Sequence, residues 1–152
     1  MAVYGTVDWL LHRPPTGVVE PHRIVDLHLG EIGRPDLSEY GFSYPQYMAL
    51  EATQDAFDAV AAYAKVPRMI GGEGRPFEEV VTQWVSGSYF PLLGVQPQLG
   101  RLFTLDDDVD GAPALAVISH AYWQSRLGGQ PDVLGETLRV GPDPVTIVGV
   151  LP

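Results

Sequence analysis

The sequence predicts an α+β fold, a mixed sheet with short helices packed on it. Short β-rich segments recur along the 152 residues, whereas only two or three segments have the apolar spacing of a helix. Seventeen glycines and 14 prolines divide the chain into short elements. Because 45% of the residues are hydrophobic, the chain can bury a core, and its length fits one domain or two small subdomains.

The N-terminal third predicts a strand followed by a helix. Residues 23–29 alternate apolar and polar side chains, which favours a half-buried strand, and residues 30–41 have the Gly, Pro, Asp and Ser of a loop. Ser43 can cap a helix that continues to Gln54. We expect Phe57 to anchor the chain beyond the end of this helix.

A hairpin is expected next. Residues 59–66 are ambiguous between helix and strand, and their alternation favours a strand that Pro67 ends. Residues 68–76 contain three glycines and indicate a turn, and residues 77–85 are β-rich. The glycine turn would therefore join two antiparallel strands.

Residues 85–103 predict a buried structural corner. A strand ends, a short turn of helix follows with Tyr89, Phe90 and Leu93 as anchors, and Gly94 stops it before a second strand. Such anchors belong in a core because they bury large apolar areas. The alternative is that some of these side chains line a partner-facing or lipid-facing groove, a reading that also covers Phe103 and Trp123.

Two serines in this corner also require an interpretation. Ser86 and Ser88 flank Gly87 at the point where the strand turns into the helix. The G-x-S-x-G pattern of a nucleophile elbow is missing, so helix capping explains these serines better than catalysis does.

The C-terminal third predicts a strand, a helix and a hairpin. Residues 114–118 form a short apolar run, and Ser119 can cap a helix over residues 120–127 that Gly128 and Gly129 stop. Trp123 and Leu127 would share one face of this helix. Two further β-rich runs form the hairpin, with residues 141–144 as its loop: residues 137–140 and 145–150.

Charge and composition exclude several functions. The net charge of −10 argues against binding to nucleic acid or to an anionic lipid surface, both of which need clustered Lys and Arg. The chain has no cysteine, which excludes disulfides, thiolate nucleophiles and zinc–thiolate sites. No apolar run is long enough for a membrane helix, and the first 11 residues lack the features of a signal peptide.

No metal or cofactor site is expected. Asp106, Asp108 and Asp110 match the first, third and fifth positions of an EF-hand loop, but the twelfth position is Val117 instead of Glu. We therefore expect a solvated acidic loop and leave ion binding open. The histidines lack the spacing of a metal site, and the glycines at 71–74 lack the Gly-Lys-Ser/Thr ending of a phosphate loop.

An enzyme is not expected either. Neighbouring carboxylates such as those at 78–79 and 107–108 point to opposite faces of a strand. A catalytic carboxylate site would require residues distant in the sequence to meet in one cleft: Asp26, Glu51, Glu78 and Asp106.

Three blocks of sequence resemble the MacB-like periplasmic core domain of FtsX/MacB-type ABC transporter permeases. Residues 85–103 have the arrangement V-S-G-x-Y-F-x-x-L-G-V-x-P-x-L-G-R-x-F, and residues 116–138 and 145–152 continue the resemblance. Residues 10–25 match less specifically. The positions that carry the pattern, which we expect to be structural, are Ser86, Gly87, Tyr89, Phe90, Leu93, Gly94, Gly100, Arg101, Phe103, Trp123 and Gly135.

The resemblance implies an extracytoplasmic domain of a bacterial inner membrane protein, with a porter-like part and a small α/β subdomain that meet near residues 85–103. It implies a non-catalytic role that couples cytoplasmic ATP hydrolysis to export of a substrate or to regulation of a partner. The implied partners are the membrane helices and the ATPase of the same transporter, with a periplasmic adaptor or lipoprotein as a further one. Since no membrane helix is present and the chain stops at Pro152, residues 1–152 are expected to be a fragment of a larger permease. The alternative is a stand-alone periplasmic module that binds a ligand or a lipoprotein, which a deep apolar groove would favour.

Overall fold

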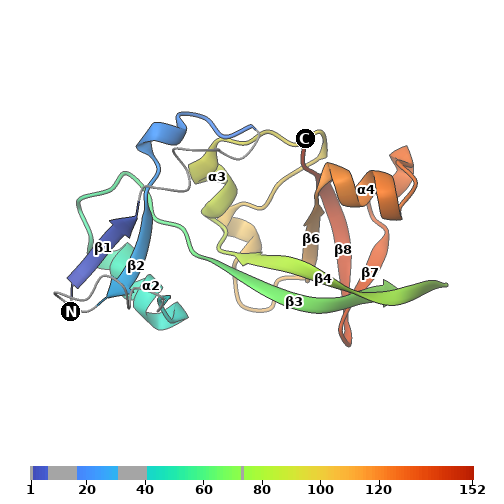
Figure 1. Ribbon diagram of the computed structural model, residues 1–152, viewed down its shortest axis with the longest axis horizontal. Coiled ribbons are helices and arrows are strands. Elements are labelled where there is room, and N and C mark those ends of the chain that lie inside the picture. Colours follow the sequence, from blue (N-terminus) through green and yellow to red (C-terminus); the bar gives the residue numbers. More distant parts are fainter. Residues whose placement is uncertain (1, 7–16, 31–40, 73) are drawn as a thin grey trace.

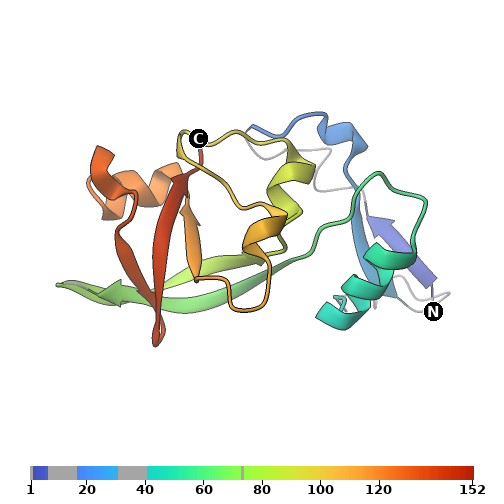
Figure 2. The ribbon, with the colours of Figure 1, turned by 180° about the vertical axis from the view of Figure 1, so that it is seen from behind.

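The computed structural model describes residues 2–6, 17–30, 41–72 and 74–152. At one end of the molecule, β1 (Ala2–Thr6) pairs antiparallel with β2 (Asp26–Gly30), and α2 (Tyr44–Thr53) lies near them. A mixed six-stranded sheet with α4 (His120–Arg126) forms the other end (Figures 1 and 2). The predicted α+β fold with a mixed sheet and short helices is confirmed.

The strand predicted at residues 23–29 begins later than expected. A short 3₁₀ helix, η1 (Pro21–Arg23), precedes it, and the Arg23 N–H donates to the carbonyl of Glu20. Proline is favoured in the first turn of a helix, so this turn displaces the start of β2 to Asp26. The predicted loop at 30–41 falls largely on residues 31–40, which lie outside the described residues.

The α2 helix begins as predicted. Its N-cap is Ser43, whose backbone N–H donates to Gln46 Oε1 at 2.8 Å, with Pro45 in the first turn. The helix ends at Thr53, one residue before the predicted end, because the cap residue Gln54 is extended. Phe57 remains 37% exposed, so the expectation of a buried anchor beyond the helix was wrong.

The hairpin is longer than predicted. β3 (Tyr63–Gly72) and β4 (Arg75–Val85) form it, so both the stop at Pro67 and the long turn at 68–76 were wrong. Proline is tolerated because of register: the Ser86 N–H donates to the carbonyl of Ala62, so the even-numbered residues of β3 bond to β4. The nitrogen of Pro67 therefore points away from β4, and β7 (Thr137–Val140) pairs with β3 only from Ile70 onward.

The remaining elements complete the six-stranded sheet. Val150 pairs with both Leu99 and Ile118, so β8 lies between β5 and a parallel β6. The β7–β8 hairpin is confirmed, but its loop shortens to residues 141–142 because Val140 pairs with Asp143. The elements are α3 (Tyr89–Leu93), β5 (Leu99–Gly100), η3 (Leu105–Asp107), β6 (Leu115–Ile118), η4 (Pro131–Val133), β7 (Thr137–Val140) and β8 (Asp143–Val150).

Two apolar clusters pack on opposite faces of this sheet. In β6, Ile118 contributes to the cluster under α4, whereas Val117 packs against the cluster around α3. Trp123 and Leu127 are both buried in the α4 cluster, which confirms the shared helix face. In the described part of the chain, no helix is long and apolar enough to cross a membrane.

Candidate functional site

The turn formed by residues 86–88 joins the end of β4 to α3, and it lies where three other segments meet. Ser86 is 4% exposed. Its backbone N–H donates to the carbonyl of Ala62 at 3.0 Å, and its Oγ accepts the Ala62 N–H at 3.0 Å. This pair of bonds attaches the turn to the segment that leads into β3.

The hydroxyl of Ser88 connects the same turn to α2. The single proton of Ser88 Oγ is shared between the carbonyl of Val60 at 2.9 Å and the hydroxyl oxygen of Tyr47 at 3.2 Å. That hydroxyl donates to Glu51 Oε1 at 2.9 Å, and Tyr47 is the buried residue of α2. The helix is thus bonded to a residue 41 positions along the chain.

The third segment is the acidic loop. The backbone N–H of Gly87 donates to Asp108 Oδ2 at 2.8 Å. A Cβ at position 87 would lie 2.7 Å from the carbonyl oxygen of Thr104 and 2.9 Å from the Cα of Leu105. Only glycine therefore fits beneath this loop.

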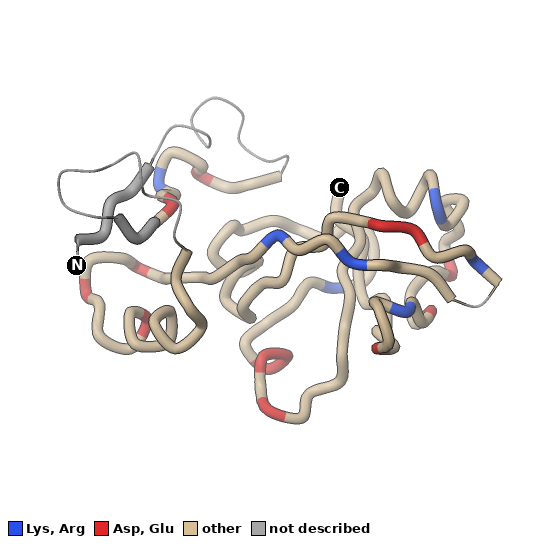
Figure 3. Tube along the Cα trace, turned by 60° about the horizontal axis from the view of Figure 1, so that its bottom comes forward, with Lys and Arg blue, Asp and Glu red and all other residues tan. Residues whose placement is uncertain are grey.

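Arg101 and Asp107 hold the acidic loop in shape. The two guanidinium nitrogens of Arg101 donate to the two carboxylate oxygens of Asp107 at 2.7 and 2.8 Å. This bidentate pair, with the backbone N–H of Thr104, lowers the pKa of the Asp107 carboxyl to about 2. The loop projects from the body of the molecule (Figure 3), yet Asp107 and Asp108 are both bonded to protein groups.

Aromatic side chains of α3 form the apolar side of the corner. Phe90 is 8% exposed, with its ring centroid 5.4 Å from that of Tyr89 and 5.6 Å from that of Phe103. Burial raises the pKa of Tyr89, whose hydroxyl accepts a hydrogen bond from Gln83 Nε2 at 2.6 Å. Leu93 completes the cluster at 9% exposure, so the predicted core anchors are buried here.

Glycines of the corner allow backbones to approach each other. Gly94 has φ of 66°, as a helix stop requires, and a Cβ there would lie 2.9 Å from Val19. Gly100 pairs with Gly149 between β5 and β8, and a side chain at Gly100 would collide with the carbonyl oxygen of Val148, as one at Gly149 would with that of Arg101. A glycine inside a strand signals such an approach, but the sequence reasoning did not use Gly149 in this way.

The α4 end contains the last two pattern residues. Trp123 Nε1 donates to the carbonyl of Gln130 at 2.8 Å, so the buried indole also fixes the loop after α4. Gly135 has φ of 88°, and its N–H donates to the carbonyl of Ile147 at 2.8 Å. A Cβ at position 135 would meet open space, so close packing is not the reason for glycine there. Glycine is favoured at 135 by its positive φ.

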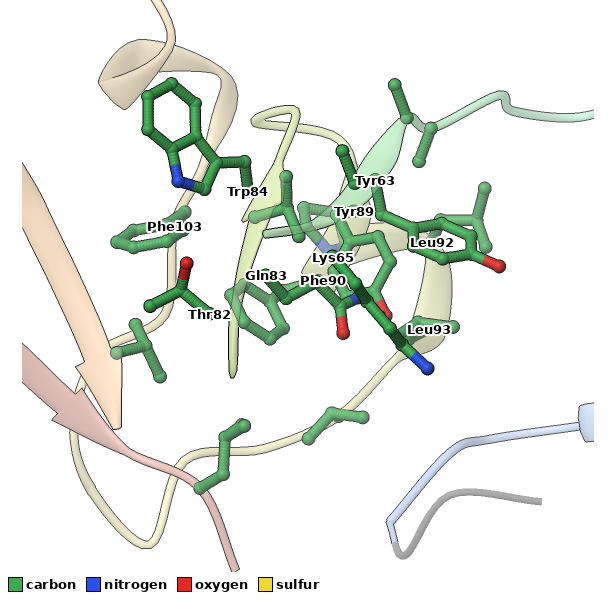
Figure 4. A pocket seen from close by; sticks show the side chains of 18 of the residues that line it. Tyr63, Lys65, Thr82, Gln83, Trp84, Tyr89, Phe90, Leu92, Leu93 and Phe103 are labelled. Atoms are coloured by element: carbon green, nitrogen blue, oxygen red, sulfur yellow. The ribbon is translucent and has the colours of Figure 1, made fainter. Parts of the chain in front are cut away.

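An open cleft of about 2420 Å³ borders the corner. Figure 4 shows Tyr63, Trp84, Phe90 and Phe103 among the side chains that line it, together with Lys65. Trp84 is 59% exposed. Phe90 and Phe103 belong to a core cluster and also line this cleft, so the alternative of a partner-facing or lipid-facing groove stays a prediction.

The four residues considered for a catalytic carboxylate site do not come together. Asp26, Glu51 and Glu78 interact with Tyr63, Tyr47 and Arg126 respectively, and Asp106 is exposed on η3. Within residues 17–30, 41–72 and 74–152, no three His, Asp or Glu residues are grouped as a metal site would require. His120 Nδ1 lies 2.7 Å from Gln98 Oε1, and Gly71, Gly72 and Gly74 lie at the tip of the β3–β4 hairpin.

Ser86 and Ser88 act differently from the prediction. Ser88 is the N-cap residue of α3, but neither serine hydroxyl makes a capping bond, because both bond to the segment at 60–62. The sequence reasoning also missed Tyr47 and Asp108, whose partners are 41 and 21 positions away in the chain. No local pattern could have identified these two residues.

The comparisons with known proteins identify the family of the chain. The sequence model of the MacB-like periplasmic core domain family matches residues 8–152. The chain belongs to this family. As a MacB-like periplasmic core domain it is an extracytoplasmic domain of ABC transporter permeases, which confirms the resemblance and the predicted location. No curated protein matches the chain.

Solved structures share the fold of this MacB-like domain. The periplasmic region of MacB from Actinobacillus actinomycetemcomitans superposes with a TM-score of 0.66 at 18% identity, over 82% of this chain and 57% of that one. The extracellular domain of the noncanonical ABC-type transporter YknZ from Gram-positive bacteria gives 0.63 at 23% identity, over 73% of this chain and 57% of that one. The chain thus spans 57% of the length of each of these two structures.

Proposed function

We propose that this domain is a non-catalytic mechanical coupler within a larger ABC transporter permease. It would transmit movement driven by ATP hydrolysis at a separate cytoplasmic ATPase to the extracytoplasmic side, for export of a substrate or regulation of a partner. The membrane helices and the ATPase of the same transporter are the partners in this proposal, and a periplasmic adaptor or lipoprotein is a further one.

The observation that carries the proposal is the 86–88 turn. Three segments are bonded to it: α2 through Tyr47, the 60–62 segment through Ser86 and Ser88, and the acidic loop through Asp108. A displacement of any one segment must either break these bonds or move the turn, because hydrogen bonds tolerate little change in length. We therefore place the boundary between two subdomains in this corner, within residues 85–103.

The proposal is tested in the complete transporter with Tyr47→Phe, which removes the hydroxyl between α2 and Ser88. We expect ATP hydrolysis to continue while substrate moved per ATP falls. Tyr44→Phe, on the exposed side of the same helix, is the matched control and should change neither. Equal transport per ATP in wild type and Tyr47→Phe would contradict coupling through this turn, and ATP turnover by the 152-residue chain alone would contradict the non-catalytic role.

A binding function is the second candidate, and the aromatic cleft is the observation that favours it. In this alternative the domain holds an apolar ligand or the acyl chain of a lipoprotein against Trp84 and Phe103. The indole of Trp84, being exposed, would report binding by a change of fluorescence on titration with a fatty acid. An unchanged spectrum, with Trp84→Phe as the reference for the other two tryptophans, would count against it.

A further inference from the structure

The β4 strand is a long, unpaired edge of the six-stranded sheet. It has 11 residues and lies at the end of the strand order, with β3 on one side and no described strand on the other. Because the even-numbered residues bond to β3, the N–H and C=O groups of the odd-numbered residues point outward. These residues are Phe77, Glu79, Val81, Gln83 and Val85.

Few features protect this edge. Natural sheets block free edges with proline, charged side chains, bulges or very short strands. Here Pro76 and Glu79 lie near the hairpin tip, but Val81, next to the centre of the strand, is 68% exposed. Phe77 is 49% exposed and lies on the same face of the hairpin as Val81. Free backbone groups in a strand bind another extended strand, which identifies the chemistry of the occupant.

We propose that two copies of this chain associate through antiparallel pairing of their β4 strands, with the two-fold axis at Val81. The choice of a second copy rests on self-complementarity. With Val81 opposite Val81 of the second copy, Glu79 lies opposite Gln83 and Phe77 opposite Val85, so apolar residues face apolar ones and no like charges meet. Centring the pair on Glu79 would instead set two carboxylates against each other.

The neighbouring registers match less well. Moving the axis to Val80 sets Glu79 against Val81 and Phe77 against Gln83, which pairs polar with apolar side chains. Moving it to Gln83 runs Glu79 into Gly87, where the acidic loop already occupies the backbone. Pairing along a single strand buries little surface, so the dimer is weak and transient. This inference does not depend on the proposed coupling role.

Crosslinking tests the register directly, because the chain has no cysteine of its own. In a Val81→Cys variant the two Cα atoms would lie about 5.5 Å apart across a hydrogen-bonded pair, within the range of a disulfide. Diamide, which accepts the two electrons of thiol oxidation, should therefore yield a covalent dimer. Glu79→Cys is the matched control: its two copies would be offset by four residues, roughly 13 Å, and should stay monomeric.

Charge provides the second test. The pair of residue 83 with Glu79 of the second copy occurs twice in the dimer. Gln83→Lys would place a positive charge opposite Glu79 in both pairs, whereas Gln83→Glu would place a second carboxylate there. We expect the dissociation constant to fall about threefold or more for Lys and to rise about threefold or more for Glu. Within one chain Lys65 lies opposite Gln83. The free energy of unfolding should therefore fall for Gln83→Lys and rise for Gln83→Glu. These changes separate an effect on folding from an effect on association.

Sedimentation velocity on the full chain, at concentrations up to about 1 mM, measures the association. A concentration-dependent dimer, crosslinked by Val81→Cys alone and shifted in opposite directions by the two Gln83 variants, supports the proposal. A monomer at every concentration would overturn it and would leave the edge to another partner or to solvent. A dimer that crosslinks equally at Glu79→Cys, or ignores the Gln83 charge, would overturn the β4 register.

Discussion

The α4 end of the molecule is closed by buried apolar side chains, whereas the α2 end is held by a few polar contacts. Val133, Ile147 and Val150 are fully buried beneath α4. In α2 the buried residue is Tyr47, while Tyr44 and Met48 are 56% and 46% exposed. A buried aliphatic side chain contributes several times the net free energy of one hydrogen bond, so the two ends differ in how much they resist displacement.

Under the proposed coupling, this difference predicts which part moves. Ion pairs such as Arg23 with Asp58 lie at the α2 end with both side chains exposed, and such pairs add little stability. The 86–88 turn lies between the rigid sheet and this weakly held part. If the proposed coupling is right, α2 and the segment at 60–62 form the mobile arm, and the sheet forms the base.

The largest effect should come from breaking the base. Ile147→Ala removes a side chain with no exposure from the centre of the α4 cluster. The cavity and lost apolar burial should reduce the free energy of unfolding by about 3 kcal/mol. Val109→Ala, at a site that is 59% exposed, is the control and should cost less than about 0.5 kcal/mol. Urea unfolding measures both, and equal losses would contradict the assignment of the core to β8.

The next effect should come from the contact between the turn and the acidic loop. Gly87→Ala places a Cβ 2.7 Å from the Thr104 oxygen, so the loop must shift and the bond to Asp108 lengthens. We expect a loss of about 2 kcal/mol. Gly41→Ala, where a Cβ meets nothing within 4 Å, should be neutral or slightly stabilising. Two equally tolerated alanines would show that the loop is not fixed on the turn.

The elements that depend on local signals were predictable, and those that depend on distant partners were not. The Ser119 cap, the helix it begins and the β7–β8 hairpin follow from neighbouring residues, and the structure has all three. Pro67 and Gly71 indicated a turn, yet pairing with β4 keeps both within β3. Strand register overrode the local preference because it decides which way each backbone nitrogen points.

The candidate site was predictable only in part for the same reason. Tyr89, Phe90 and Leu93 are large apolar residues at helical spacing, and burial follows from their chemistry. The role of Ser86 and Ser88 follows from the chain at 60–62, which the fold brings to them over more than 20 residues. Hydroxyl groups can cap a helix or bond elsewhere, and the sequence does not show which acceptor is near.

A smaller effect is expected where the mobile arm meets the turn. Tyr47→Phe should cost about 1 kcal/mol of unfolding free energy, since it removes bonds to Glu51 and Ser88 and keeps the ring. Amide hydrogen exchange in α2 should accelerate more than exchange in β8, because the lost bonds hold the arm alone. Tyr44→Phe is again the control. Uniform acceleration across both elements would show that α2 and the sheet open together, which would contradict the comparison between the two ends.

The smallest effect should be the pH dependence of the acidic loop. The pKa of Asp107 is about 2 in the folded chain, below its usual 3.8, so this carboxylate stabilises the fold above pH 3.8 and loses its contribution as the pH falls to about 2. Because the Arg101 side chain is 51% exposed, the contribution should stay below about 1 kcal/mol. Asp107→Asn should flatten the stability curve in this window, whereas Asp106→Asn, on the exposed neighbour, should leave the slope in place. A slope that persists in Asp107→Asn would mean that acid weakens the base rather than the loop, because the carboxylate of Asp107 would no longer be present to titrate.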